Sequence, residues 1–99
     1  MNKREELKKF SNFGLALKKA MKYLGNDVDF RISTRKDKKY MVKTPDGKWS
    51  HFGQMGYEDH TKHQDALRRQ RYLDRSTRIR GNWKKEKYSP NNLSINILW

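Results

Sequence analysis

The residue types with the clearest chemistry are the arginines between residues 68 and 81. The segment RRQRYLDRSTRIRG contains six arginines, one aspartate and no lysine, whereas lysine is the commoner base in the rest of the chain. A guanidinium donates two parallel hydrogen bonds to a phosphate or carboxylate and stacks on bases or aromatic rings, which a lysine ammonium cannot do. The preference for arginine therefore predicts recognition of an anion whose geometry matters.

Three sources of negative charge compete for these arginines. They are the phosphates of a nucleic acid, the acidic groups of a partner protein, and carboxylates of the same chain, namely Glu58, Asp59 and Asp65. A helix that needed only solubility would interleave more glutamates, and lysine would serve it equally well. Phosphate contact is therefore the first hypothesis, an acidic partner protein the second, and internal pairing the third.

The arginines also share one face if the segment is helical. At 100° per residue, Arg68, Arg71, Arg75 and Arg78 fall within about 80° of one another, and Ala66 and Leu73 lie nearly opposite. This spacing predicts an arginine side and a core side. The predicted binding residues are these arginines and their neighbours, with four lysines from the preceding strands: Arg68, Arg69, Arg71, Arg75, Arg78, Arg80, Lys38, Lys39, Lys43 and Lys48.

A histidine cluster raises a metal or nuclease hypothesis. His60 and His63 are three residues apart near a helix start, so both could face one ion, with Asp59 or His51 completing the ligand set. Asp59 and Asp65 fit equally well as helix N-terminal caps. We therefore predict no metal site, no cofactor and no catalytic residue, and keep a histidine–metal nuclease as a third functional alternative.

Four aromatic residues flank the arginines: Tyr57, Tyr72, Trp83 and Tyr88. Basic residues interleaved with aromatic rings can bind single strands by stacking on the bases. A domain this small, however, needs nearly all of its rings in the core. The core assignment is therefore the preferred prediction.

The elements that position these residues follow from hydrophobic periodicity. Helical spacing links Phe13, Ala16, Leu17, Ala20, Met21 and Leu24, with Ser11 or Asn12 as N-cap and Gly25 as the stop. Alternating residues and the TPDGK turn predict a three-stranded antiparallel meander over residues 27–53.

A second helix is expected from Thr61 to about Thr77. The apolar segment SPNNLSINILW is either a strand or, with Ser89 as cap and Pro90 at the first position, a short helix, which we favour.

These elements predict a small α+β fold: residues 1–10 form a charged leader and residues 11–99 a single domain. Its 33% hydrophobic content is low, but twelve per cent aromatic residues argue against disorder.

The formal charge of +13 predicts attraction to polyanions. Neither a membrane span nor a signal peptide is expected, and the absence of cysteine excludes disulfides and thiol chemistry. We expect no membrane partner and no small-molecule substrate.

Residues 40–99 resemble a group of short, basic proteins encoded by large DNA viruses and some phages. The pattern comprises a His-Phe-Gly strand end, Asp-x-Thr, His-x-Asp, an arginine-rich helix with Tyr-Leu-x-Arg, and a closing Leu-Ser...Leu-Trp. Here these elements are His51, Phe52 and Gly53; Asp59 and Thr61; His63 and Asp65; Arg68, Arg69, Tyr72, Leu73 and Arg75; Leu93, Ser94, Leu98 and Trp99. His60 and Ser76 depart from it, where an aromatic residue and a histidine are expected, which argues against a shared histidine-based site.

The resemblance implies a setting, either a virion or the cytoplasm or nucleoid of an infected host cell. Combined with the arginine face, it predicts a non-enzymatic protein that binds a polyanion, first of all genome phosphates. The alternative is a minor capsid protein that glues shell components together, because arginines that pair with acidic capsid surfaces would be the same residues.

Overall fold

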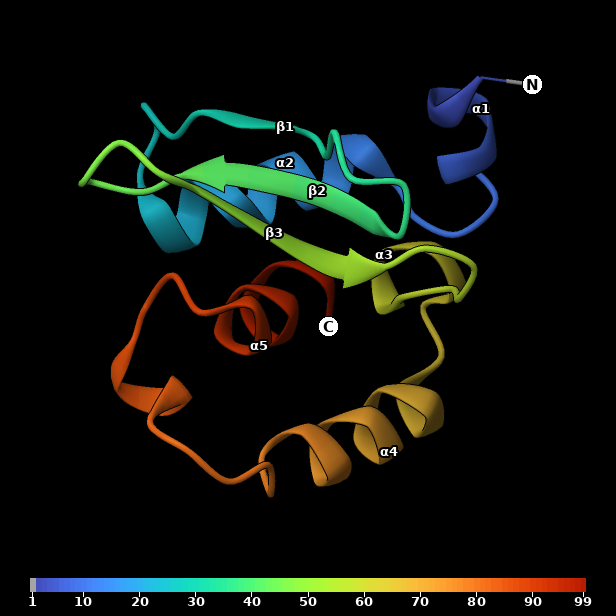
Figure 1. Ribbon diagram of the computed structural model, residues 1–99. Coiled ribbons are helices and arrows are strands. Elements are labelled where there is room, and N and C mark those ends of the chain that lie inside the picture. Colours follow the sequence, from blue (N-terminus) through green and yellow to red (C-terminus); the bar gives the residue numbers. More distant parts are fainter. Residues whose placement is uncertain (1) are drawn as a thin grey trace.

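A three-stranded antiparallel sheet lies at the centre of the structure, a computed structural model that describes residues 2–99. Its strands are β1 (Phe30–Ile32), β2 (Lys38–Lys43) and β3 (Trp49–Gln54), hydrogen-bonded in the order β1-β2-β3 (Figure 1). The predicted meander is confirmed, and its TPDGK turn places Gly47 at φ 85°, where glycine is favoured. With the helices described below, the sheet makes an α+β fold, as predicted.

The first long helix, α2 (Phe13–Leu24), also agrees with the prediction. Asn12 is the N-cap, since its side-chain oxygen accepts the N–H of Leu15 at 3.1 Å, and Gly25 follows the last turn at φ 110°. The helix buries Ala16 and Ala20 against the sheet and the C-terminal segment. None of the helices in residues 2–99 has the length and apolar character needed to cross a bilayer.

The charged leader contains a short helix, α1 (Lys3–Leu7). Leu7 is only 2% exposed and belongs to the hydrophobic core. The Lys3 ammonium donates to the backbone carbonyls of Ser33, at 2.6 Å, and Arg35, between β1 and β2. These contacts attach the leader to the sheet. Met1, the first residue of the predicted leader, lies outside the described residues.

The helix predicted over residues 61–77 is in fact two helices, α3 (His60–His63) and α4 (Ala66–Ser76). Gln64 between them is left-handed, with φ 55°. Asp65 starts α4 by accepting the N–H groups of Leu67 and Arg68 at 3.0 and 3.2 Å. Side-chain bonds of this kind compete with helical continuation, and they account for a break that hydrophobic periodicity does not reveal.

The C-terminal segment is helical, which confirms the preferred alternative. A 3-10 turn, η1 (Trp83–Lys85), precedes α5 (Pro90–Leu93), and the chain continues as the π-helix η2 (Ser94–Leu98). Ser89 caps α5 by accepting the N–H of Asn92 at 3.3 Å. Because no break separates α5 from η2, the two act as one helical unit beside β3 and α2.

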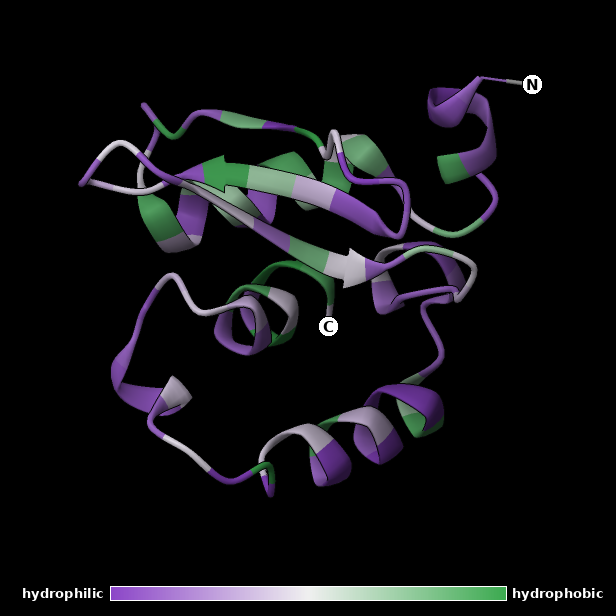
Figure 2. Ribbon diagram, viewed as in Figure 1, coloured by the Kyte–Doolittle hydropathy of each residue, from purple (hydrophilic) through white to green (hydrophobic). Residues whose placement is uncertain are grey.

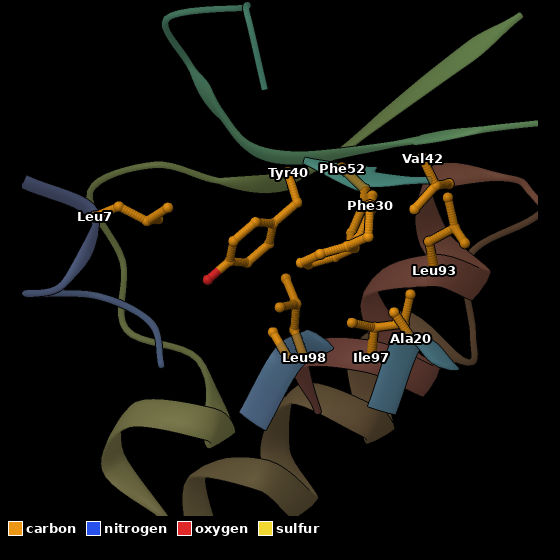
Figure 3. Close-up of a cluster of buried hydrophobic side chains, with 10 residues drawn as sticks. Leu7, Ala20, Phe30, Tyr40, Val42, Phe52, Leu93, Ile97 and Leu98 are labelled. Carbon is orange, nitrogen blue, oxygen red and sulfur yellow. The ribbon is translucent and has the colours of Figure 1, made fainter. Parts of the chain in front are cut away.

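The core is a layer of rings from the sheet facing aliphatic side chains from the helices. Phe30, Tyr40 and Phe52 extend from the three strands toward Ile97 and Leu98 (Figure 3). The ring centroids of Phe30 and Tyr40 are 4.9 Å apart and those of Tyr40 and Phe52 6.0 Å, within the range of favourable aromatic contacts. By contrast, α4 is mostly hydrophilic and stands away from this layer (Figure 2).

Gly53, one residue before the end of β3, is required by both its conformation and its neighbours. Its φ is 82°, and a Cβ atom there would lie 2.8 Å from Leu98 Cδ1 and 3.1 Å from Lys39 Cβ. Gly47 has a similar φ of 85° but nothing within 4 Å of a built Cβ. The two glycines therefore differ in crowding and not in backbone strain.

We predict that Gly53→Ala lowers the free energy of unfolding by about 2–5 kcal/mol, from left-handed strain plus overpacking. Gly47→Ala, the matched control, should lose only about 1–2 kcal/mol, from strain alone. Urea denaturation of both variants, followed by circular dichroism, measures the difference. Equal losses would show that the C-terminal helix does not pack against Gly53.

A buried ion pair connects the sheet with the segment before α2 and the segment before α3. The Lys39 ammonium lies 3.0 Å from Asp59 Oδ2, and these side chains are 2% and 1% exposed. The ammonium also donates to the carbonyl oxygens of Tyr57 at 2.5 Å and Phe10 at 3.4 Å. Asp59 Oδ1 accepts both the N–H and the hydroxyl of Thr61.

The network extends from Thr61 into the core. Thr61 Oγ1 lies 3.1 Å from Ser11 Oγ and accepts the N–H of Asn12 at 3.0 Å, and the Tyr40 hydroxyl donates to Ser11 Oγ at 2.7 Å. Burial is the main reason that the pKa of Lys39 is lowered, and Asp59 opposes that shift. Burial similarly raises the pKa of Tyr40. These groups are stable inside the protein because their hydrogen bonds are made.

Lys39→Met should reduce the free energy of unfolding by about 3–5 kcal/mol, because Asp59 would remain buried without its cation. Asp59→Asn should be less harmful in the Lys39→Met background than in the wild type, since the double variant carries no buried charge. A double-mutant cycle by chemical denaturation measures this coupling. Additive losses would mean that the two side chains do not interact.

Candidate functional site

A groove of about 810 Å³ separates α4 from the rest of the protein. Arg68, Arg71 and Arg75 of α4 line one wall. The other walls come from the sheet and from the C-terminal helical unit, and their lining residues include Lys38, Gln54, Tyr57, Asn91, Leu98 and Trp99. Figure 1 shows α4 set apart from β3 and α5, which contribute residues to the other walls of the groove.

Few contacts hold α4 in place, and they lie beside its arginines. The Tyr72 ring stacks on Trp99, with centroids 4.1 Å apart and planes within 9°. The Arg69 Nε group donates to the Trp99 carbonyl at 2.7 Å. At the far end of α4, Asn91 Nδ2 donates to the Ser76 carbonyl at 3.0 Å. The helix therefore forms one side of the groove, and it is held by Trp99 in its first half and by Asn91 at its last residue.

These contacts correct the predicted core side of the helix. Ala66 is exposed and Leu73 only half-buried, whereas Tyr72 and the buried Ser76 face the protein. On a helical wheel Tyr72 and Ser76 lie within about 80° of Arg68, and not opposite it. The arginine side is therefore turned toward the groove, because aromatic stacking on Trp99, and not aliphatic packing, sets the rotation of α4.

The arginines have different partners. Arg68 pairs with Glu58 at 3.1 Å, but the two side chains are 48% and 37% exposed, so the pair adds little stability. The other ion pairs in residues 2–99 are Arg31–Asp29 and Lys39–Asp59. Within the described chain, Arg71 and Arg75 consequently line the groove without a carboxylate partner.

The remaining arginines either lie outside the groove or already donate a hydrogen bond within the protein. Arg69 donates its Nε–H to the Trp99 carbonyl oxygen. Arg78 and Arg80 follow α4 on an exposed segment and are not among the lining residues. Of the acidic residues considered as internal partners, Glu58 alone pairs with an arginine; Asp65 caps α4 and Asp59 pairs with Lys39.

The four lysines of the predicted interface occupy three different environments. Lys38, half-buried, lines the groove from the start of β2. Lys39 is buried with its ammonium on Asp59, so it supports the fold and is not available to a ligand. Lys43 is exposed at the other end of β2, about 17 Å from Lys38 at 3.3 Å per residue, and Lys48 follows the hairpin turn. The structure therefore does not gather all ten predicted residues.

The histidines are not assembled into the ligand set considered from the sequence. His60 and His63 are adjacent, with ring centroids 5.7 Å apart, but Asp59 faces Lys39 and His51 Nδ1 lies 2.7 Å from Ser33 Oγ. Among residues 2–99, no group of three or more histidine, cysteine or acidic side chains is placed to hold a metal ion.

His63 instead forms part of the support of α4. Its ring lies 5.1 Å from that of Trp99, and its Nδ1 accepts the N–H of Asp65 at 2.9 Å. Its Nε2 is buried and has no hydrogen-bond partner among the described residues. Burial, followed by Arg68 and His60, lowers the pKa of His63; burial, followed by Lys19 and Arg69, lowers the pKa of His60.

Two residues outside the predicted binding set contribute to the groove. Tyr57 is 71% exposed at its edge, although the preferred prediction places the flanking rings in the core. Trp99 supplies the platform for Tyr72. The apolar C-terminal pattern does predict that Trp99 docks on the protein, but no local signal indicates that α4 is its partner.

Comparison with known proteins adds a family without an assigned function. Residues 28–76 match the model of a family of unknown function, DUF5754. The matched segment runs from just before β1 to the last residue of α4, and so includes the arginines of the groove but not its C-terminal wall. No curated protein and no solved structure matches the chain.

The lowered pKa values predict that stability falls as pH decreases from about 7 to 5. Unfolded histidines bind protons near their ordinary pKa of 6.5, whereas the folded protein resists protonation of His51, His60 and His63. Their stabilising contribution is therefore complete above pH 6.5 and is lost as pH falls toward the lower folded values. Thermal unfolding across this range measures the effect.

His63→Gln provides the control, because glutamine can accept the Asp65 N–H but does not titrate. Its melting temperature should depend less steeply on pH than that of the wild type. An unchanged pH dependence would exclude His63 as a contributor.

Proposed function

We propose that the protein binds nucleic-acid phosphates in the groove between α4 and the sheet, without catalysing a reaction. The observation that carries this proposal is that Arg71 and Arg75 line the groove with no carboxylate partner in the described residues, while Lys38 lines its sheet side. Glu58 is the one acidic residue among those lining the groove, and it is already paired with Arg68.

Electrostatics favours a ligand that brings several negative charges. Arg71 and Arg75 are one helical turn apart, where like charges cost a few tenths of a kcal/mol, and Arg68 lies nearby on the same face. The overall charge of +13 raises the positive potential further. A phosphate placed between the walls would relieve this repulsion and accept paired hydrogen bonds from each guanidinium.

The biological setting of the proposal rests on the sequence resemblance alone. A viral or phage protein of this kind would meet its phosphates on a genome, in a virion or an infected cell. An acidic shell protein remains the second candidate partner, because carboxylates also accept paired hydrogen bonds from arginine. The two candidates differ in whether an oligonucleotide binds on its own.

Affinity for labelled oligonucleotides, measured by fluorescence anisotropy, should fall as salt rises. Arg71, Arg75 and Lys38 are in no ion pair among residues 2–99. If each contacts one phosphate, the slope of log affinity against log salt should be about −2 for a single strand and about −2.7 for a duplex. Changing both Arg71 and Arg75 to alanine should weaken binding and flatten the slope by about 1.4 to 1.8, because two phosphate contacts are lost.

The control variant removes two exposed lysines at the other end of the sheet, Lys43→Ala with Lys48→Ala, and so loses the same net charge. It should retain most of the affinity. If both variants weaken binding equally, the groove has no special role and net charge alone attracts the ligand. If no oligonucleotide binds the wild type, the nucleic-acid proposal is wrong.

A further inference from the structure

We infer that the ligand of this groove is a single-stranded nucleic acid, with one base stacked on Tyr57. The inference rests on the proposed function and specifies its substrate class. Two features of the groove lead to it. The arginines lie in a concavity, and an aromatic ring without a stacking partner stands at its edge.

The concave placement disfavours a duplex. A helix that reads double-stranded DNA enters the major groove with its contact residues on its outer, convex face. Here Arg68, Arg71 and Arg75 line the space between α4 and the rest of the protein. Tyr72 and Ser76, next to the arginines on α4, are tied to Trp99 and Asn91, so α4 cannot present this face outward while these contacts last.

A flexible strand does not meet that obstacle. A volume of about 810 Å³ is in the range of pockets that enclose small organic ligands, and suits a base with its sugar and phosphate. The two walls supply cations from opposite sides, Lys38 from β2 and the arginines from α4. A strand in the groove would have phosphates within reach of both walls while its bases remain unpaired.

Tyr57 supplies the surface on which a base can stack. Its side chain is 71% exposed, and no ring of residues 2–99 is paired with it, whereas Tyr72 is stacked on Trp99 and Tyr40 lies in the core. Its backbone is fixed, because its carbonyl oxygen accepts the Lys39 ammonium at 2.5 Å. Because the backbone is already held, a base that covers the ring has to order only the side-chain torsions of Tyr57.

Gln54 and Asn91 also line the groove and provide amide donors and acceptors beside the ring and the cations. Cations that follow a backbone, combined with an aromatic surface for the bases, are the general requirement for binding single strands without strong sequence preference. The groove has both. We therefore expect weak discrimination among bases.

The test compares four labelled probes of equal length, about 12 nucleotides. They are oligo(dT), oligo(U), a duplex, and an abasic strand that keeps the phosphates but has no bases. We expect either or both single strands to bind at least about 10-fold more tightly than the duplex and the abasic strand. The two single-strand probes also establish whether DNA or RNA is preferred.

Tyr57→Ala should weaken binding of the preferred single strand by about 5-fold to 150-fold, which corresponds to about 1–3 kcal/mol for one stacked base. Its salt slope should stay unchanged, because tyrosine neutralises no phosphate. Tyr57→Phe should bind as the wild type does. Melting temperatures of both variants should equal that of the wild type, because the ring is exposed.

Two results would overturn the inference while leaving phosphate binding intact. One is equal affinity for the single strands, the duplex and the abasic probe, all weakened by the Arg71 and Arg75 double variant. The other is a Tyr57→Ala protein that binds the single strands as tightly as the wild type. If none of the four probes binds, both the inference and the proposed function fail.

Discussion

The buried ion pair between Lys39 and Asp59 is the constraint on which the arrangement of this small protein depends. Removing two charges from water costs several kcal/mol for each ion, and good geometry with complete hydrogen bonding is needed to offset it. The pair meets this condition through the carbonyls of Tyr57 and Phe10 and through Thr61. Strand β2, the segment before α2 and the start of α3 must therefore come together at one point, and a shift of any of them would leave a charge unsatisfied.

The candidate site is built outward from that point. The carbonyl of Tyr57 is held by the ammonium while its ring projects to the groove edge, and Asp59 also caps α3, whose His63 packs against Trp99. Trp99 in turn carries Tyr72 of α4. A chain of contacts thus leads from the buried charges to the helix that bears the arginines. One side of the groove is continuous with the core, and the other side, α4, is held there by its contacts with Trp99 and Asn91.

The basic residues predicted to bind a ligand have different roles in the folded structure. Lys39 forms the buried ion pair with Asp59, Arg69 donates a hydrogen bond to Trp99, and Arg68 forms an exposed ion pair with Glu58. Arg71, Arg75 and Lys38 line the groove and form no ion pair among residues 2–99. Under the proposed function, the net charge of +13 would attract a polyanion to the protein as a whole, and the groove would determine where and in which geometry it binds.

The sequence by itself determined the elements whose signals are local. The periodicity and caps of α2, the TPDGK turn of the meander, and Ser89 with Pro90 at the start of α5 depend on residues within a few positions of one another, and these predictions are confirmed. The tertiary structure decided which residues are covered. Lys39 is buried because Asp59 and main-chain carbonyls receive its ammonium, and α4 turns its arginines toward a groove because Tyr72 stacks on Trp99. Tyr57, by contrast, is exposed. Contacts between distant segments produce no periodic pattern in the sequence, because each contact depends on how whole helices and strands pack against one another.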